Sequence, residues 1–356
     1  MDRTVQLLVE DVAFGGAGVG HASGKAVFVP FTIDGETVSA EIVREKKKHA
    51  EARLGSIEIP SPHRAKPACP YFGRCGGCSY QHIAYDHQLA LKSRQVEQTL
   101  RRLGRLKDVP MSPIVPSPKQ YAYRNRIRVH AEDGVVGFFR HDRHELLDIE
   151  FCPIASAEPN EDLRLLRKRG ATDGDYVLAE REERYFEQTN REVAAAMLQV
   201  VFDAVGRGQR RLVDAFCGAG FFAKGLAPLF EEIVGIESNG DAVNEARRTA
   251  TAKETYIAAD VSINLAEALA AGPREKTTLI LDPPAAGLSP RAIDAICGAG
   301  PSEVFYVSCN PATLARDLQL ICRAYELIAV TPLDMFPQTA QIEVVVHLRS
   351  ASQADV

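Results

Sequence analysis

Hydrophobic and polar positions follow two different patterns along this chain. From Val5 to about Ile57, short alternating apolar runs are separated by turn signals such as GGAGVG and DGE, and this pattern predicts a small β-barrel. Beyond about Arg191, apolar runs of strand length alternate with helical stretches. The strand candidates are LVDA, EIVGIE, TYIAAD, LILD, VFYVS, ELIAV and QIEVVVHL. This alternation predicts an α/β fold with a largely parallel, doubly wound sheet covered by helices on both faces.

The stretch between these two regions is divided by prolines. The segment IPSPHRAKPACP marks a boundary near residue 59, a helix is expected over 85–103, and the proline-rich linker VPMSPIVPSPK follows. The runs in YRNRIRVHAEDGVVGFF then predict a hairpin whose tight turn is Asp133-Gly134. We therefore expect three parts: a barrel at 1–58, a middle region at 59–185 and a doubly wound domain at 186–356.

Composition narrows the class of protein. The 356 residues are 46% hydrophobic and 25% charged, which is typical of a soluble globular protein with more than one core. No apolar run approaches the length of a membrane helix, and acidic residues interrupt the apolar stretch near the start, so we expect neither a membrane span nor a signal peptide. A cytoplasmic location follows. There the eight cysteines stay reduced, which favours metal binding or catalysis over disulfides.

Charge is divided unevenly along the chain. Residues 1–170 hold 26 Lys and Arg against 21 Asp and Glu, whereas the remaining residues hold 16 against 26. The basic first part suggests a nucleic-acid-binding half joined to an acidic catalytic half, although solvated charged faces explain the asymmetry equally well.

Five reactive side chains stand where predicted parallel strands end. They are Asp214, Glu237, Asp260, Asp282 and Cys309. In a doubly wound sheet, ligands bind beyond the carboxyl ends of the strands. Simple packing would not select four carboxylates and a thiol there, so we interpret this edge as the candidate site.

The first of these strands leads into the loop DAFCGAG. Gly218 and Gly220 let the backbone approach a ligand closely. Glu237 could accept hydrogen bonds from ribose hydroxyls, and Asp260 could accept one from an adenine amino group. The two glycines and Ala223, with an acid downstream, also fit a nicotinamide-binding fingerprint. The loop by itself therefore leaves S-adenosylmethionine and a nicotinamide cofactor as alternatives.

The fifth strand separates these alternatives, because it runs into Cys309 at the start of a helix. A helix N-terminus favours a thiolate, so we expect the pKa of Cys309 to be lowered. Such a nucleophile suits methylation of uracil carbon 5, which becomes reactive only after a thiolate adds to carbon 6. The carbon 5 proton must then leave, and Glu343, the lone charge in an apolar run, is the candidate base. An exposed edge-strand glutamate is the simpler alternative for Glu343.

A cysteine cluster lies in the middle region. Cys69, Cys75 and Cys78 share one glycine-rich loop, and Cys152 is the candidate fourth thiolate. Four thiolates hold either a tetrahedral zinc ion or an iron-sulfur cluster, and the spacing alone does not decide between them.

A basic and aromatic stripe is expected on the hairpin. Arg124, Arg126 and Arg128 alternate along one predicted strand, and we place Tyr121 and Tyr123 on the same face just before them. Cations with aromatic rings suit phosphate contact and base stacking, so this stripe is a candidate RNA-binding surface. A solvated strand face is the alternative.

Four segments together resemble the RNA uridine-C5 methyltransferases: SCNPATLARD around Cys309, DMFPQTAQIE ending at Glu343, FEQTN at 186–190, and DAFCGAG. The start of the chain, with VAFGGAGVG and KAVFVP, resembles the TRAM domain. CPYFGRCGGC resembles the iron-sulfur branch typified by the 23S ribosomal RNA enzymes. The resemblance implies a class I (Rossmann-like) methyltransferase domain, an OB-like TRAM barrel, and a small middle domain for an iron-sulfur cluster and RNA.

The same resemblance implies a role for each matching residue. Cys309 is the nucleophile and Glu343 the base. Beside the glycines of the loop, the expected contacts to S-adenosylmethionine come from Gln188, Phe216, Glu237, Asp260 and Asp282. A [4Fe-4S] cluster is expected on Cys69, Cys75, Cys78 and Cys152. The expected partner is RNA, with 23S rRNA favoured over tRNA; neither DNA nor a membrane is expected, and the protein is expected to be a monomer.

Three departures from the family pattern bear on this interpretation. Phe221 stands where the family often has Asn, which affects one cofactor hydrogen bond. Alanines occupy positions 285 and 286, where an arginine commonly follows Asp-Pro-Pro. The stretch between Cys152 and Phe186 is short for the family, which bears on target choice. The alternative hypotheses are a tRNA enzyme, a non-catalytic RNA-binding cluster protein and a nicotinamide oxidoreductase.

Overall fold

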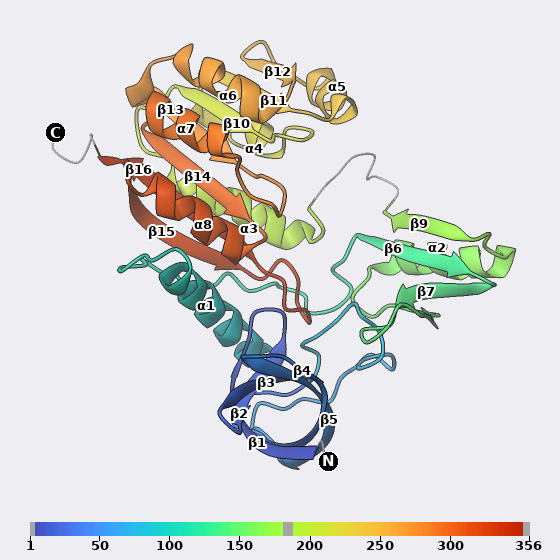
Figure 1. Ribbon diagram of the computed structural model, residues 1–356. Helices are drawn as coiled ribbons and strands as arrows, with labels where there is room; N and C mark the ends of the chain where they lie inside the picture. Colours follow the sequence, from blue (N-terminus) through green and yellow to red (C-terminus); the bar gives the residue numbers. More distant parts are fainter. Residues whose placement is uncertain (1–3, 181–187, 352–356) are drawn as a thin grey trace. The chain divides into compact units, whose positions relative to one another are not determined.

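The computed structural model describes residues 4–180 and 188–351. They form two compact units that are interleaved along the chain (Figure 1). The N-terminal unit comprises Met1–Gln95, Pro118–Arg181 and Phe336–Gln341. The sheet unit comprises Val96–Ser117, Glu182–Met335 and Ile342–Val356. Each unit is described by itself below.

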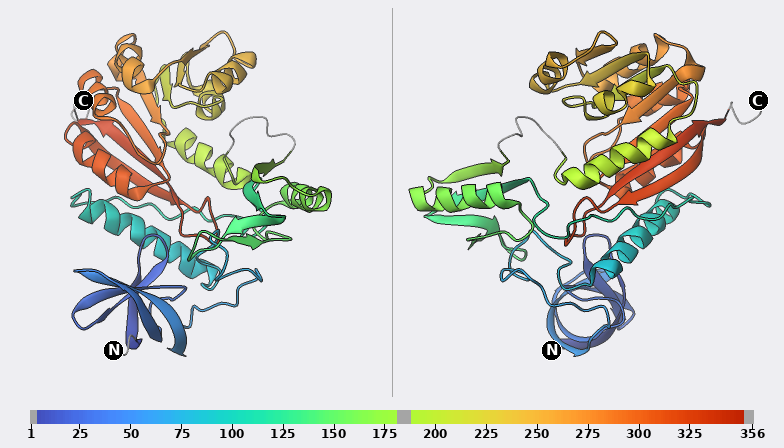
Figure 2. Two further views of the ribbon diagram at one scale, coloured as in Figure 1. Left: turned by 45° about the vertical axis from the view of Figure 1, so that its right-hand side comes forward. Right: turned by 180° about the vertical axis from the view of Figure 1, so that it is seen from behind.

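Five strands close into a barrel at the start of the chain, as the alternating pattern predicts. Their order is β1-β2-β3-β5-β4, and they appear as a ring in the right-hand view of Figure 2. Their bounds are β1 Thr4–Val12, β2 Ala17–Ala22, β3 Lys25–Pro30, β4 Thr37–Glu45 and β5 His49–Ile59. Valines 9, 27, 29 and 38 fill the interior, so the barrel has a core of its own.

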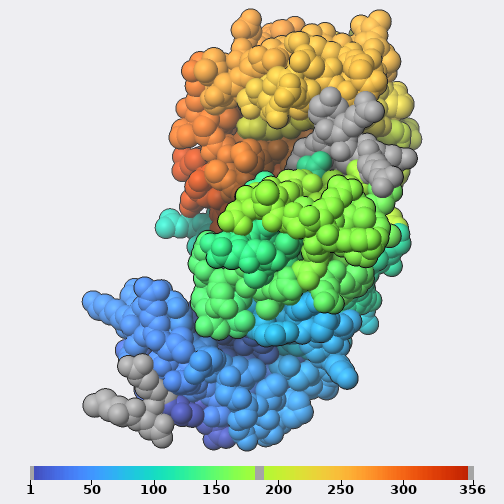
Figure 3. All heavy atoms as spheres, turned by 90° about the vertical axis from the view of Figure 1, so that its right-hand side faces the viewer, coloured from blue at the N-terminus to red at the C-terminus, as the bar shows by residue number. Residues whose placement is uncertain are grey.

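A four-stranded sheet and one helix follow in the N-terminal unit. The bounds are β6 Arg126–Glu132, β7 Val135–Phe139, β8 Leu146–Asp148, α2 Ala157–Arg169 and β9 Gly174–Ala179. The strand order is β8-β7-β6-β9. Helix α2 covers one face of the sheet, with Leu163 packed against Val129 and Ile127 in a separate core. Figure 3 shows this part of the chain, in green, as a closely packed surface.

The predicted tight turn between β6 and β7 is confirmed. Asp133 and Gly134 both have positive φ, 50° and 78°. A two-residue hairpin loop of this kind needs positive φ at both positions, which Asp-Gly supplies at low cost.

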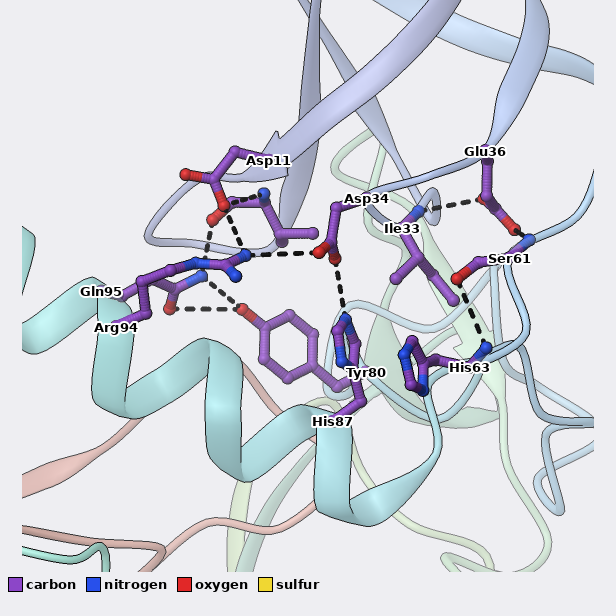
Figure 4. A network of polar contacts seen from close by, with 11 residues as sticks. Asp11, Ile33, Asp34, Glu36, Ser61, His63, Tyr80, His87, Arg94 and Gln95 are labelled. Atoms are coloured by element: carbon purple, nitrogen blue, oxygen red, sulfur yellow. Dashed lines mark hydrogen bonds and ion pairs between the residues drawn. The ribbon is translucent and has the colours of Figure 1, made fainter.

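Helix α1, Tyr85–Arg102, confirms the helix predicted over 85–103. A polar network on its first half holds the barrel (Figure 4). The Arg94 guanidinium donates to Asp11 Oδ1 at 2.7 Å and to Asp34 Oδ2 at 3.4 Å. His87 Nε2 lies 2.8 Å from the other oxygen of Asp34. The polar face of this helix therefore anchors the barrel.

The sheet unit contains seven strands in the order β12-β11-β10-β13-β14-β16-β15. Its elements are α3 Arg191–Ala204, β10 Arg211–Ala215, α4 Phe221–Gly225, β11 Glu232–Glu237, α5 Gly240–Arg248, β12 Glu254–Ala258, α6 Val261–Ala270, β13 Thr277–Leu281, α7 Pro290–Ala299, β14 Glu303–Ser308, α8 Pro311–Ile321, β15 Tyr325–Leu333 and β16 Glu343–Ser350. All seven predicted strands are present. The first five strands along the chain pair in parallel, whereas β16 is antiparallel to both of its neighbours.

Helices cover both faces of this sheet, as predicted. Helices α6, α7 and α8 pack side by side on one face, and α3 lies on the opposite face, as the front and back views show (Figure 1 and Figure 2). The central strands β10, β13 and β14 are buried along their whole length. The architecture is that of a class I methyltransferase fold.

The three-part division expected from sequence differs from these units. The expected barrel and middle region fall mostly in one unit, whereas residues 96–117 of the expected middle region belong to the sheet unit. The expected boundary at 185/186 lies outside the described residues and stays a prediction. Among the described residues, no helix combines the length and apolar character that a membrane span requires.

Candidate active site

Strand order brings the predicted acids and thiol to one edge of the sheet. Glu237 ends β11, Asp282 follows β13 and Cys309 follows β14. Asp260 caps α6 just beyond β12, and Asp214 is the penultimate residue of β10. These strands are parallel, so their carboxyl ends share an edge, which is where doubly wound sheets bind ligands.

The loop after β10 has the backbone conformation expected of a cofactor loop. Phe216 and Cys217 donate their N–H groups to the Ile236 carbonyl at 2.9 and 3.1 Å, which extends the parallel pairing into the loop. Gly220 has a φ of 90°, and a Cβ there would lie 2.8 Å from the Tyr256 hydroxyl. Glycine is therefore required at position 220 by both its conformation and its surroundings.

The carboxylate of Glu237 is oriented by the same loop. Gly218 donates its N–H to Glu237 Oε2 at 3.2 Å. Asn239 N and the Ser238 hydroxyl donate to Oε1 at 2.7 and 3.0 Å. A carboxylate fixed in this way at the end of the second strand can present an acceptor to a ligand, as the sequence predicts.

Asp214 lies beneath the loop and is fully buried. Its Oδ2 accepts a hydrogen bond from the Ala223 N–H at 2.8 Å, which ties β10 to α4. Burial raises the pKa of Asp214 to about 8, with smaller contributions from the charges of Asp282 and Glu237. Asp214 therefore holds the start of α4, and with it the end of the loop, against β10.

Asp260 and Gln188 also lie where the sequence expects site residues. The Asp260 carboxylate accepts from the Ser262 N–H at 2.7 Å and from its hydroxyl at 2.6 Å. The Ser262 hydrogen bonds lower the pKa of Asp260. Gln188 Nε2 donates to Asp282 Oδ2 at 3.4 Å, so Gln188 is at the same edge. Phe186 and Glu187 of the FEQTN segment lie outside the described residues.

Sheet register places Cys309 across from Glu343. Strands β14 and β16 are antiparallel, and Ser308 pairs with Val344. The next position along this register is Cys309 against Glu343, and directly opposed residues point to the same face of a sheet. Cys309 is exposed, whereas Glu343 is 4% exposed. The buried-strand interpretation of Glu343 is confirmed, and the edge-strand alternative is wrong.

The pKa prediction for Cys309 is wrong. Burial, followed by the negative charges of Glu343 and Asp282, raises the pKa of this thiol to about 11. The helix N-terminus carries only a partial positive charge, and burial together with the two nearby carboxylates outweighs it. The sequence identified both carboxylates but did not show that they face the thiol.

The two carboxylates beside Cys309 are perturbed themselves. Burial raises the pKa of Asp282 to about 7. Burial and the charge of Asp282 raise the pKa of Glu343 well above the ordinary glutamate value. A buried carboxyl with a raised pKa binds a proton more readily, which is the property required of a general base near neutral pH.

A clamp that the sequence analysis missed joins the Asp282 loop to the Cys309 helix. Asn310 Nδ2 and the Thr313 hydroxyl both donate to the Ala285 carbonyl at 3.1 Å. The fully buried Asp317 accepts from the Leu288 N–H at 2.8 Å and from the Tyr306 hydroxyl at 2.7 Å. The sequence offers only weak signals for it, namely the hydroxyl of Tyr306 in a largely apolar strand and the acid at the end of SCNPATLARD.

The four predicted cluster cysteines surround one cavity. The residues Cys69, Cys75, Cys78 and Cys152 line a space of about 320 Å³. Burial, and then the charges of the neighbouring cysteines, raises the pKa of Cys75 to about 11; burial also dominates for Cys78, whose pKa rises to about 12. The structure thus brings the four thiols together. No three His, Cys, Asp or Glu side chains of the described residues are arranged as ligands of a metal ion.

The predicted RNA-binding stripe is only partly present. Strand β6 begins at Arg126, so Arg124 precedes it, and both Arg124 and Arg128 line the cysteine cavity. Tyr123 is 5% exposed and donates its hydroxyl to the Pro337 carbonyl at 3.0 Å. The placement of Tyr123 beside the arginines is wrong, because odd and even positions of an extended segment face opposite ways.

Comparison with known proteins agrees with this architecture. A family model described as tRNA (uracil-5-)-methyltransferase matches residues 166–269 and 267–351, and the TRAM domain model matches residues 3–54. An uncharacterized RNA methyltransferase of Bdellovibrio bacteriovorus is 34% identical over 97% of this chain and 95% of its own length. Another, from Aquifex aeolicus, is 29% identical over 96% of this chain and 97% of its own.

A solved structure supports the fold. The tRNA (uracil-54, C5)-methyltransferase of Pyrococcus abyssi, in complex with S-adenosyl-L-homocysteine, superposes with a TM-score of 0.72 at 24% identity. The match covers 97% of this chain and 100% of that one. The chain therefore belongs to the tRNA (uracil-5-)-methyltransferase family of S-adenosylmethionine-dependent RNA methyltransferases and begins with a TRAM domain.

Proposed function

We propose that this protein transfers a methyl group from S-adenosylmethionine to carbon 5 of a uridine in RNA, with Cys309 as nucleophile and Glu343 as general base. The observation that carries the proposal is the pairing of Ser308 with Val344 in β14 and β16. Continued by one position, this register opposes Cys309 and Glu343. A thiol and a buried carboxyl that face each other, with Asp282 beside them, supply the two groups that this reaction requires.

The chemistry explains why both groups are needed. Carbon 5 of uracil is too weak a nucleophile to be alkylated directly, so covalent help is required. The Cys309 thiolate forms a bond to carbon 6 and shifts the ring electrons towards carbon 5. Carbon 5 then takes the methyl group as the sulfur–methyl bond of S-adenosylmethionine breaks and S-adenosyl-L-homocysteine leaves. The carbon 5 proton passes to Glu343, and the electron pair left behind expels the sulfur and restores the double bond.

The raised pKa of Cys309 fits this sequence of steps. A protonated thiol does not attack, and burial, followed by the charges of Glu343 and Asp282, raises the pKa of Cys309. S-adenosylmethionine supplies a sulfonium-bound methyl group and a positive charge. A positive charge beside these carboxylates offsets their effect on the thiol, so we expect the nucleophile to be activated only when the methyl donor is bound.

Seven residues are proposed to bind S-adenosylmethionine. They are Gln188, Phe216, Gly218, Gly220, Glu237, Asp260 and Asp282. Glu237 is held by Gly218 and Asn239 in an orientation suited to ribose hydroxyls. Asp260 is suited to the adenine amino group, and Asp282 with Gln188 to the methionine end.

A [4Fe-4S] cluster is proposed on Cys69, Cys75, Cys78 and Cys152. One zinc ion needs four sulfur atoms about 2.3 Å from a single point. Four thiols around one cavity suit a cluster, in which each cysteine binds a different iron, and the resemblance of CPYFGRCGGC to the iron-sulfur branch favours the cluster over zinc. The cluster would supply the positive charge that four half-buried thiolates need. Methyl transfer has no net redox change, so we assign these cysteines a structural role.

Purification without oxygen tests the cluster. We expect a brown protein with absorbance near about 400 nm, from thiolate-to-iron charge transfer, and metal analysis should find iron and acid-labile sulfide. Cys78→Ser should lower the iron content, whereas Cys322→Ser, outside the four, should not. A colourless protein that contains zinc would remove the proposal.

The proposed target is ribosomal RNA, on the resemblance of the cysteine loop to the 23S rRNA enzymes. Transfer RNA is the second candidate, because the matching family is described as tRNA (uracil-5-)-methyltransferase. The proposed RNA contacts are Arg124, Arg126 and Arg128. Tyr123 is withdrawn as a stacking residue, because it is buried.

Incubation of the purified protein with labelled S-adenosylmethionine and total RNA from cells that lack the gene tests the proposed function. We expect label in 5-methyluridine after nucleoside analysis, and the size of the labelled RNA distinguishes ribosomal from transfer RNA. Absence of label in RNA would support the non-catalytic alternative, and label in another nucleoside would contradict carbon 5 as the target.

A further inference from the structure

The chain between β15 and β16 leaves the sheet unit and returns to it. Residues 336–341 belong by their contacts to the N-terminal unit, whereas Met335 and Ile342 on either side belong to the sheet unit. We call residues 336–341 the crossing loop. Glu343 is the first residue of β16 and follows this loop after one residue. The proposed base is therefore covalently tied to a loop that the N-terminal unit holds.

Helix α1 holds the crossing loop through a reciprocal pair of amides. Gln88 Nε2 donates to Gln338 Oε1 at 3.0 Å, and the Gln338 backbone N–H donates to Gln88 Oε1 at 3.1 Å. One turn further along the helix, Lys92 Nζ donates to the Phe336 carbonyl at 3.0 Å. Gln88 and Lys92 are fully buried, and Gln338 is 3% exposed. Buried polar groups are costly unless hydrogen bonded, so these contacts specify where the loop lies.

The loop that carries Cys69, Cys75 and Cys78 also holds the crossing loop. Ser79, which follows Cys78, donates its N–H to the Gln338 carbonyl at 3.2 Å and accepts at its hydroxyl from the Ala340 N–H at 2.9 Å. The next N–H, of Tyr80, donates to the same Gln338 carbonyl at 2.9 Å. Gln341, at the end of the crossing loop, lines the cysteine cavity. The cysteine cavity and Glu343 are thus two residues apart along the chain.

Backbone strain in the crossing loop points to a role beyond closing a hairpin. Gln338 has a φ of 69°, a conformation that residues other than glycine adopt rarely. Its N–H, carbonyl and side-chain oxygen are all engaged by the contacts described above. Strained residues that their surroundings enforce cluster at functional sites, and this one lies five positions before Glu343.

We propose that the crossing loop sets the position of Glu343 for removal of the carbon 5 proton, with Gln88 and Gln338 as positioning residues. This inference rests on the proposed function. Misplacement of a reacting group by about 1 Å can slow its step about 10²-fold. The pairs that β14 makes with β13 and β16 lie outside residues 336–341, so we expect the attack of Cys309 to be unaffected. The N-terminal unit thereby takes part in the last step of the reaction.

Gln88→Leu tests the proposal, because it removes the amide pair and nearly keeps the size of the side chain. It also removes the bonds from Gln88 Nε2 to the Tyr80 and Ile83 carbonyls, so its effect on stability is measured beside that of the control. With 5-fluorouridine RNA, whose fluorine cannot leave as a proton, the rate of covalent adduct formation reports thiol attack and methyl transfer, and we expect it unchanged. With ordinary RNA, we expect kcat to fall about 10-fold to 100-fold, the KM for S-adenosylmethionine to stay constant, and the covalent adduct to accumulate on denaturing gels.

Gln95→Leu is the matched control. Gln95 is on the same helix and is also buried, but it donates to the barrel carbonyl of Val12 at 2.7 Å and to the Tyr80 hydroxyl at 3.0 Å (Figure 4). We expect Gln95→Leu to lower thermal stability as Gln88→Leu does, without accumulation of the adduct. Gln338→Gly offers a second variant, because glycine accepts the positive φ and only the side-chain bond to Gln88 is lost.

The outcomes distinguish a failure of this inference from a failure of the proposed function. Wild-type protein that forms neither 5-methyluridine nor an adduct would contradict the proposed function itself. Active wild-type protein with equal adduct release in Gln88→Leu, Gln338→Gly and Gln95→Leu would overturn the positioning role alone. Loss of adduct formation together with release in Gln88→Leu would also overturn it, because the defect would then not be confined to the base.

Discussion

Replacement of Cys309 by alanine is expected to abolish methyl transfer and every covalent adduct with RNA. Without the thiol, carbon 6 gains no substituent and carbon 5 stays unreactive towards the methyl group. Loss of a catalytic nucleophile can cost on the order of 10⁶-fold in kcat. Release of label into 5-methyluridine and trapping by 5-fluorouridine RNA measure the two effects.

Cys297→Ala is the control for this experiment. Cys297 is a half-buried thiol on α7 that packs against the sheet core, so its replacement should leave turnover and trapping in place. S-adenosylmethionine should bind to Cys309→Ala as it does to the wild type, which shows that the cofactor site is intact. Full activity of Cys309→Ala would refute the assigned nucleophile.

Replacement of Glu343 by glutamine is expected to stop the reaction after methylation. Glutamine keeps the shape and hydrogen-bonding capacity of the side chain but cannot accept the carbon 5 proton. General base catalysis typically contributes on the order of 10²–10⁴-fold, so product release should slow by that factor while the protein–RNA adduct accumulates. Denaturing gels with ordinary RNA and mass spectrometry of the Cys309 peptide detect the adduct.

A glutamate on the neighbouring strand serves as the comparison. Glu326 on β15 is exposed, and Glu326→Gln should release product at the wild-type rate. An adduct that fails to form in Glu343→Gln would place Glu343 in thiol attack or cofactor binding, and would contradict its assignment as the base.

Much of the fold was predictable because its elements have strong local signals. The barrel strands alternate in polarity, the Asp133-Gly134 turn has the residues that its φ angles require, and the seven strands of the large sheet are separated by clear helical stretches. Interleaving of the two units was not predictable, because a local pattern does not show which distant segments pack together. The second half of α1 illustrates this: Val96 and Leu100 belong to the core of the sheet unit.

The candidate site was also predictable only in part. Acids that follow strands were found from position alone, because parallel strands share one edge. The pKa of Cys309 was not predictable, since it depends on the burial of the thiol and on the through-space distance to Glu343 and Asp282. Tyr123 and the clamp between Asp317 and Tyr306 were missed for a related reason: burial and hydrogen-bond partners are set by tertiary contacts.

The interleaved chain has a consequence for the order in which the protein is made. Ala340 packs with Val12, Ile33 and Tyr80 in one small core, so the region synthesised first lacks part of its interior until almost the whole polypeptide has left the ribosome. Domains generally complete their folding from the N-terminus during synthesis. Here the N-terminal unit must wait for residues near the opposite terminus, and both units reach their final packing only at the end of translation.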